Sequence, residues 1–265
     1  FALRYITKHL QMFQSKNKGV PIFENYSTIY CGAEPIRQPT VSQFLEEAIP
    51  LGLKPSALYF SYGLAEATLI VSGYRFSSLK EAFDQSRTTE PVARLGSAVG
   101  NMKIRLETAR YENDSPHGRV LISGPSLFSG YGFQDRSNSE EWVDTGDIGY
   151  LLNGELYLCG RAKDTIIVNG ENLYVADIEN IVIRHFPVRD CIVLPDSDAF
   201  HILVVPDKCG DFRTEDISRK VLHSLGVAPR TTLITLARDI LRTTSGKPMR
   251  SEILKRLKQE CKVAC

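Results

Sequence analysis

Two short apolar runs near the start of the chain each stop at a glycine, and this pattern constrains the fold most strongly. Residues 26–31 are predicted to form a buried strand that stops at Gly32, and residues 57–62 a second short strand followed by Gly63. Between them, residues 39–51 have the pattern of an amphipathic helix, because a proline suits the first helical turn and a glycine follows the last. This alternation indicates mixed α/β architecture for residues 1–160.

The same stretch carries a strong hairpin signal. Asn153-Gly154 stands between two alternating runs, at 148–152 and 155–159. Asn-Gly in this setting favours a two-residue hairpin turn, because both residues tolerate positive φ. Residues 103–108 and 119–123 also alternate and are predicted to be strands.

After residue 162 the pattern changes to a compact α+β unit of about 100 residues. Helices are predicted at 176–186, 214–225 and 251–262, and strands at 165–168, 191–194, 201–205 and 232–236. Thr214 is expected to cap the middle helix and Gly226 to end it. We therefore predict two domains, residues 1–162 and residues 163–265.

The first residues already follow a helical apolar stripe. Phe1, Leu3, Ile6, Leu10 and Phe13 recur at helical spacing, and no capping residue precedes them. A chain that opens inside a helix is expected to be a piece of something longer.

Charge and composition limit the classes of partner and the cellular compartment that we expect for this chain. The 32 Lys and Arg residues against 31 Asp and Glu residues leave a net charge of +1, which gives no footprint of nucleic-acid binding. The longest apolar runs are of strand length, so no membrane span is predicted. The six cysteines form no CxxC pair, and we interpret them as free thiols in a reducing, cytoplasmic compartment.

Common nucleotide and metal motifs are absent. Gly246-Lys247 is followed by Pro248, which excludes the phosphate loop GxxxxGK[ST]. Gly130-Tyr-Gly132 lacks the third glycine of the dinucleotide pattern. The histidines never fall at i, i+4, the spacing of helical zinc ligands.

Five other segments are polar, contain glycine and stand at predicted strand ends or in a loop. They are Gly32-Ala-Glu-Pro35, Tyr62-Gly-Leu-Ala-Glu-Ala-Thr68, Trp142-Val-Asp-Thr-Gly-Asp147, Gly160-Arg-Ala-Lys-Asp164 and Thr243-Thr-Ser-Gly-Lys247. Taken singly, each is explained as well by a capping carboxylate, a turn residue, a charged linker or a loop lysine.

Together and in this order, the five segments resemble the adenylate-forming superfamily of acyl-CoA synthetases, nonribosomal adenylation domains and luciferases. Within it they are most similar to the fatty acyl-AMP ligases, which carry Ala where other branches have Thr at the position of Ala65. The resemblance covers roughly residues 28–255. It implies the end of a large mixed α/β domain followed by a small, mobile α+β C-terminal domain.

The resemblance also implies a reaction. Such enzymes join a carboxylate to the α-phosphate of ATP and expel pyrophosphate, so two anions must meet and cations must neutralise them. Lys247 would bridge the acyl carboxylate and the α-phosphate, and Glu66 would hold Mg²⁺ on the phosphates. The acyl group would then pass from acyl-AMP to the phosphopantetheine thiol of an acyl carrier protein.

Nucleotide binding is assigned by the same resemblance. Asp147 would accept hydrogen bonds from the ribose hydroxyls, Arg161 would donate to ribose or phosphate, and the ring of Tyr62 would face adenine. The implied ATP-binding residues are Gly32, Ala33, Glu34, Tyr62, Gly63, Ala65, Asp147 and Arg161. Lys163 is the expected hinge on which the small domain turns.

The family's phosphate loop and most of its acyl pocket lie upstream of the Gly-Ala-Glu-Pro segment, where this chain has only 31 residues. We therefore expect this chain to be the C-terminal portion of such an enzyme. It is expected to be inactive by itself and to have the missing N-terminal portion as a partner. Alternatives are an acyl-CoA ligase, an amino-acid adenylation domain, or a non-catalytic adenylation-like binding module.

Overall fold

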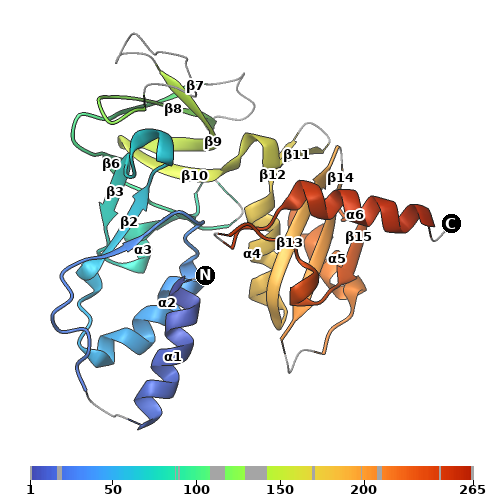
Figure 1. The fold of residues 1–265 in the computed structure, drawn as a ribbon, viewed down its shortest axis with the longest axis horizontal. Helices are drawn as coiled ribbons and strands as arrows, with labels where there is room; N and C mark the ends of the chain where they lie inside the picture. Colours follow the sequence, from blue (N-terminus) through green and yellow to red (C-terminus); the bar gives the residue numbers. More distant parts are fainter. Residues whose placement is uncertain are drawn as a thin grey trace. The chain divides into compact units, whose positions relative to one another are not determined.

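The computed structural model of the chain describes residues 2–16, 20–86, 88, 90–107, 117–128, 142–168, 171–197, 199–207, 211–244 and 246–263. The chain divides into two compact units, Phe1–Ala162 and Lys163–Cys265. Figure 1 labels helices and strands of both units, and each unit has its own buried apolar residues. Among the described helices, none is both long and apolar enough to cross a membrane.

Two helices open the first unit. The expected stripe forms helix α1 (Ala2–Lys16), and helix α2 (Gln38–Ala48) continues into a 3-10 turn, η1 (Ile49–Leu51). Gly52 ends this segment with a φ of 90°, as predicted for a glycine after a helix. The two helices contact each other, and the Gln14 side chain donates to the Glu47 carbonyl over 2.6 Å.

The first sheet has the strand order β1-β2-β3-β6. Its strands are β1 (Ile29–Cys31), β2 (Leu58–Tyr62), β3 (Ser72–Arg75) and β6 (Ser97–Ala98). Strands β1 and β2 are parallel, and the other pairs are antiparallel. Both predicted strands exist, but β1 begins only at Ile29, and Tyr30 is 64% exposed, so this strand is not buried throughout. Strands β3 and β6 were not predicted.

The second sheet is an antiparallel meander with the order β10-β9-β8-β7. Its strands are β7 (Lys103–Glu107), β8 (Gly118–Ser123), β9 (Val143–Leu152) and β10 (Glu155–Arg161). Asn153 and Gly154 have φ values of 53° and 78°, which confirms the predicted hairpin turn. A short helix, α3 (Leu79–Ala82), precedes a small strand pair, β4 (Phe83–Asp84) and β5 (Val92–Ala93).

The second unit is a three-stranded sheet with helices on both faces. Strands β13 (Val188–Asp196) and β14 (Ala199–Pro206) are antiparallel, and β15 (Thr231–Ile234) runs parallel to β14. The other elements are the hairpin β11 (Thr165–Val168) and β12 (Glu171–Tyr174) and the helices α4 (Val175–His185), α5 (Thr214–Leu225) and α6 (Arg250–Val263).

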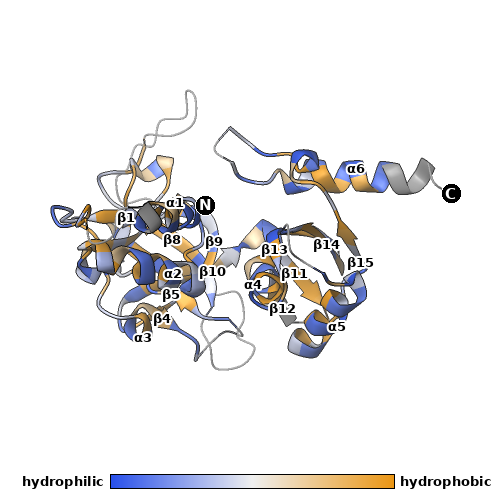
Figure 2. Ribbon diagram, turned by 90° about the horizontal axis from the view of Figure 1, so that it is seen from below, coloured by the Kyte–Doolittle hydropathy of each residue, from blue (hydrophilic) through white to orange (hydrophobic). Residues whose placement is uncertain are grey.

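Strand periodicity explains the two layers of this unit. Cys191 and Val193 of β13 pack with residues of α4 and α5, whereas Ile192 and Leu194 pack with Ile253 of α6. Successive side chains of a strand point to opposite faces of the sheet. Both faces of β13 and β14 therefore carry apolar side chains. The described part of helix α6 carries both hydrophilic and hydrophobic residues (Figure 2), and its apolar residues Ile253, Leu254 and Leu257 belong to the cluster on this face of β13.

One capping prediction is wrong. Arg213 holds the N-cap position of α5 without a side-chain hydrogen bond, and Thr214 is the first helical residue. The carbonyl of Thr214 accepts from the Ser218 hydroxyl one turn later, over 3.1 Å. Gly226 ends the helix with a φ of 70°, as predicted.

Candidate functional site

The segments Gly32–Glu34 and 63–68 lie at one edge of the first sheet. Each follows directly on one of the two paired parallel strands, β1 and β2, and parallel strands end at the same edge. A Cβ atom on Gly32 would lie 2.5 Å from the Ser61 carbonyl oxygen, and one on Gly63 would lie 1.6 Å from that of Leu69. Close backbone packing therefore explains the glycine after each strand.

The Glu66 segment is held by its backbone. Residues Ala65–Ala67 form a 3-10 turn, η3, and the Glu66 carbonyl accepts from the amide of Phe128 over 2.8 Å. Thr68 adopts a φ of 66° and donates its hydroxyl to the Ser126 carbonyl over 3.0 Å. The loop before residue 128 thus fixes the segment that presents the half-buried Glu66 side chain.

Tyr62, Asp147 and Arg161 meet in a single cluster. Asp147 of β9 and Arg161 of β10 are cross-strand partners, and the Arg161 Nε atom lies 3.0 Å from Oδ1 of Asp147. The hydroxyl of Tyr62, the last residue of β2, donates to Oδ2 of Asp147 over 2.7 Å. The cluster therefore joins the meander to the edge that carries Gly63 and Glu66.

A buried carboxylate needs partners that compensate for lost water. The Asp147 residue is 6% exposed, and it is contacted by a buried hydroxyl and by a guanidinium whose side chain is 50% exposed. Burial, and then the negative charge of Asp147, raise the pKa of Tyr62, so its hydroxyl stays protonated and remains a donor. Arg161 supplies the compensating positive charge from the solvent side.

Loss of the Tyr62 hydroxyl is expected to destabilise the first unit. In Tyr62→Phe, a buried carboxylate loses one of its hydrogen-bond donors, and hydrogen bonds to charged groups contribute about 1.5–3 kcal/mol. Urea denaturation should show a fall in the free energy of unfolding of that size. Tyr30→Phe is the matched control, because Tyr30 is 64% exposed and its change should stay within about 0.5 kcal/mol. Equal effects of the two substitutions would contradict the assigned role.

A second measurement on the same variant uses pH. The pKa of tyrosine in an unfolded chain is about 10, whereas that of Tyr62 is raised in the folded protein. Above pH ~10 the unfolded chain loses a proton that the folded chain keeps, so stability falls as pH rises. Tyr62→Phe removes this contribution, and its stability should fall less steeply there, by up to about 1.4 kcal/mol per pH unit.

Lys247 lies in the second unit, at the exit of a tight turn. The Thr243 amide donates to the Lys247 carbonyl over 2.9 Å, and the Lys247 amide donates to the Thr243 hydroxyl over 3.1 Å. Gly246 turns the backbone with a φ of 84°. The Lys247 side chain is exposed, while its backbone is fixed within the turn.

Lys163 is the first residue of the second unit. It is exposed and lies in η4 (Ala162–Asp164), a single 3-10 turn between β10 and β11. The boundary of the units thus coincides with the residue that the resemblance selects as a hinge, and the hinge role itself stays a prediction.

Sequence reasoning overlooked several supporting groups. The hydroxyl of Thr145 donates to the Val120 carbonyl over 2.9 Å and accepts from the Asp147 amide over 3.1 Å. The Asp144 carboxylate accepts from the amide of Gly146, whose φ is 72°. Short polar side chains that bond the backbone two residues on are typical of turns, so the Asp-Thr-Gly triplet carried this signal.

The described residues include no group of three or more His, Cys, Asp or Glu side chains that could hold a metal ion. Mg²⁺ bound to nucleotide usually keeps several waters and takes only one or two protein carboxylates besides the phosphates. One carboxylate, that of Glu66, is compatible with such a metal.

No protein-family model matches the chain. It is 33% identical over 196 residues to JamA of Moorena producens, a medium-chain-fatty-acid–[acyl-carrier-protein] ligase, covering 62% of this chain and 33% of JamA. It is 27% identical over 281 residues to FadD26 of Mycobacterium tuberculosis, a long-chain-fatty-acid–AMP ligase, covering 88% of this chain and 48% of FadD26.

Solved structures show the same fold. A structure of McyG A-PCP complexed with phenylalanyl-adenylate has a TM-score of 0.76 at 23% identity, covering 97% of this chain and 48% of that chain. A structure from a study of fatty acyl-adenylate ligases from E. coli and L. pneumophila has a TM-score of 0.75 at 26% identity, covering 98% and 53%.

The fold is that of adenylate-forming enzymes, which confirms the fold class expected from the five segments. The homologues include fatty-acyl-AMP ligases, which confirms the expected resemblance to that branch. The chain spans about half the length, or less, of the curated relatives that it matches.

Proposed function

We propose that this chain is the C-terminal portion of a fatty acyl-AMP ligase. In the complete enzyme, a carboxylate oxygen of the fatty acid would bond to the α-phosphorus of ATP as the bond to pyrophosphate breaks. The thiol of a carrier-protein phosphopantetheine would then attack the acyl carbon and release AMP. The observation that carries the proposal is the cluster of Tyr62, Asp147 and Arg161 beside the sheet edge of Gly32–Glu34 and Glu66.

The cluster suits a nucleoside. A carboxylate is an acceptor with two oxygens, which matches the paired hydroxyls of a ribose. In this proposal Asp147 accepts from that diol, with its orientation held by Tyr62 and Arg161 over 2.7 and 3.0 Å. The half-exposed guanidinium of Arg161 has further donors for ribose or phosphate oxygens.

The edge of β1 and β2 suits the base and the phosphates. Residues Gly32, Ala33 and Glu34 are exposed there and would form a wall beside adenine, opposite the ring of Tyr62. The backbone of Gly63 and Ala65 would follow the nucleotide, and Glu66 would hold Mg²⁺, which neutralises phosphate charge when bound. Cys31, just before this edge, is buried, and burial raises the pKa of its thiol to about 11, which favours the protonated thiol at neutral pH.

Lys247 supplies the cation for the attack of the fatty-acid carboxylate on the α-phosphorus of ATP. An exposed lysine on a fixed turn can bring a compact positive charge between the carboxylate and the α-phosphate. In this proposal, the second unit turns about Lys163 to bring Lys247 in for adenylation and to withdraw it for thiol transfer.

Exchange of labelled pyrophosphate into ATP tests the reaction. We define the joined protein as this chain fused behind an upstream segment equivalent to the one that its relatives carry. In the joined protein we expect exchange that depends on Mg²⁺ and fatty acid. We expect none from the 265-residue chain alone, because it spans about half of those relatives. Fatty-acid-dependent exchange by the isolated chain would overturn the second expectation.

The acceptor distinguishes the branches. A fatty acyl-AMP ligase should load an acyl carrier protein in preference to coenzyme A, and an acyl-CoA ligase the reverse. Exchange with amino acids instead of fatty acids would indicate an amino-acid adenylation domain. No exchange with any carboxylate in the joined protein would favour a non-catalytic binding module.

A further inference from the structure

The turn that carries Lys247 is closed at its base. Arg242 and Pro248 face each other in an isolated antiparallel bridge, and the Met249 amide donates to the Leu241 carbonyl over 2.9 Å. The turn is therefore a short hairpin, with Arg242 on its entering side and Lys247 on its leaving side.

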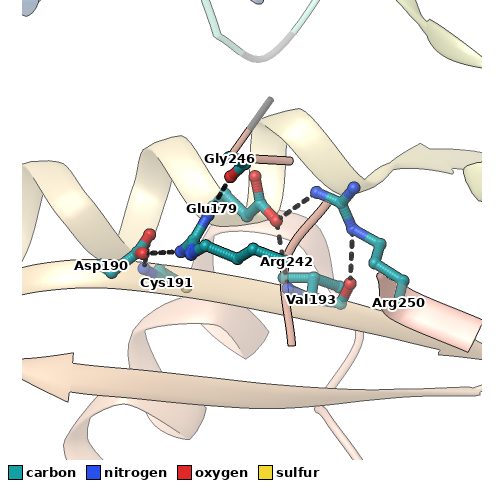
Figure 3. Close-up of polar contacts among 7 residues, drawn as sticks. All are labelled: Glu179, Asp190, Cys191, Val193, Arg242, Gly246 and Arg250. Carbon is teal, nitrogen blue, oxygen red and sulfur yellow. Dashed lines mark hydrogen bonds and ion pairs between the residues drawn. The ribbon is translucent and has the colours of Figure 1, made fainter. Parts of the chain in front are cut away.

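The Arg242 guanidinium links this turn to the sheet. Its Nη1 atom donates to the Gly246 carbonyl over 2.7 Å, and its Nη2 atom forms an ion pair with Oδ2 of Asp190 on β13 (Figure 3). The other carboxylate oxygen of Asp190 accepts from the Cys191 amide over 3.0 Å. One side chain thus ties the peptide bond that leads into Lys247 to a strand of the core.

A second arginine holds the chain after the turn. Nη2 of Arg250 lies 2.8 Å from Oε1 of the buried Glu179, and its Nε atom donates to the Val193 carbonyl over 3.1 Å (Figure 3). Burial alone would lower the pKa of Arg250, but the charge of Glu179 and the hydrogen bond to it outweigh burial and raise it. Arg250 therefore anchors the start of α6, outside the hairpin.

The two arginines differ in what they hold. Arg250 contacts the core and makes no described hydrogen bond to residues 243–247, whereas Arg242 contacts the carbonyl of the residue before Lys247. The Arg242–Asp190 pair is about one-third exposed on both sides, with 33% and 34% of the side chains accessible. Pairs this exposed add little to global stability. Their effect is then chiefly on local geometry.

We propose that Arg242, anchored by Asp190, is a positioning residue for Lys247. The inference rests on the proposed function, in which the Lys247 ammonium neutralises charge during adenylation. A lysine side chain is long and flexible, so the ammonium reaches its target only if the backbone from which it starts is fixed. Arg242 fixes that backbone through the Gly246 carbonyl, and a planar fork of donors can hold the carbonyl and the carboxylate together.

Hydrogen exchange of backbone amides in the 265-residue chain tests whether Arg242 fixes the Lys247 backbone, and the measurement requires no enzymatic activity. In Arg242→Gln, the amides of Thr243, Gly246 and Lys247 should exchange faster, while those of β13 and β14 keep their protection. Asp190→Asn should have the same effect to a lesser degree. Arg219→Gln is the matched control, because Arg219 forms an exposed ion pair with Asp216 on α5. Unchanged exchange at the hairpin in Arg242→Gln would overturn the proposal.

Kinetics of the joined protein test the consequence. Misplacement of a reacting group by about 1 Å can cost about 10²-fold, so Arg242→Gln should lower kcat for adenylation by about 10–10²-fold. KM for ATP and fatty acid should stay near that of the unmodified enzyme, and thiol transfer from preformed acyl-adenylate should be retained. Arg242→Lys, which keeps the charge but not the fork, should recover part of the rate.

The double variant shows whether the two side chains act as a unit. Arg242→Gln with Asp190→Asn should lower kcat no further than Arg242→Gln alone, because both remove one linkage. Multiplicative losses, or equal losses in both half-reactions, would contradict the proposal. If the unmodified joined protein adenylates no carboxylate, the proposed function fails by itself, and the inference is then overturned as a role in catalysis whatever the exchange data show.

Discussion

Lys247→Ala is expected to lower acyl-adenylate formation by about 10²–10³-fold in the joined protein, the usual loss when one transition-state charge contact is removed. Without the ammonium, the carboxylate and the α-phosphate approach each other with less neutralisation. Thiol transfer from preformed acyl-adenylate should be almost unchanged, because the proposed function has Lys247 withdrawn in that step. Single-turnover assays of the two half-reactions measure both rates.

A matched control distinguishes loss of the Lys247 charge from a folding defect. Lys255→Ala removes another exposed lysine of the second unit, whose partner is Glu252 over 3.0 Å, and should leave both half-reactions intact. Lys247→Ala should also keep the unmodified melting temperature, because its side chain is exposed. Equal losses in both half-reactions would show that Lys247 is structural or that the turning model is wrong.

Lys163→Pro is expected to stop one half-reaction and spare the other. Proline holds φ near −65° and removes a backbone donor, so a residue that must change its backbone angles is locked in one arrangement. Lys163 lies in a single 3-10 turn at the start of the second unit, where such a change requires little repacking. Adenylation is measured by pyrophosphate exchange, and transfer by supplying synthetic acyl-adenylate.

Lys163→Ala is the control, because it removes the ammonium and leaves the backbone free to rotate. It should retain both half-reactions, since the proposed function makes Lys163 a hinge and not a ligand. A parallel loss of both in Lys163→Pro, with a lower melting temperature, would show local unfolding. Survival of both would place the pivot elsewhere, with Asp164 as the next residue to substitute.

Elements whose signals are local in the sequence could be predicted. The apolar stripe of α1, the glycine after α2 and the Asn153-Gly154 turn all appear where the spacing placed them. Their signals lie within a few residues of one another in the chain, which is where side-chain periodicity and turn chemistry act. The Thr214 cap failed because a single threonine near a helix start does not show which residue leaves the helical backbone angles.

Short strands could not be predicted in the same way. β3 and β6 contain four and two residues, too few for a period to show. They are strands because β2 offers a neighbouring edge to β3, and β3 offers one to β6. Hydrogen bonding to a partner distant in the chain, and not local propensity, decides such elements.

The sequence by itself determined the resemblance to adenylate-forming enzymes, the α/β class and the residue types of the candidate site, because five ordered segments carry them and each is contiguous. Only the tertiary structure decided which of those residues meet. The Tyr62 hydroxyl reaches Asp147 across 85 positions, and Arg242 reaches Asp190 across 52. Such contacts depend on strand register and burial in the folded unit, which no local spacing encodes.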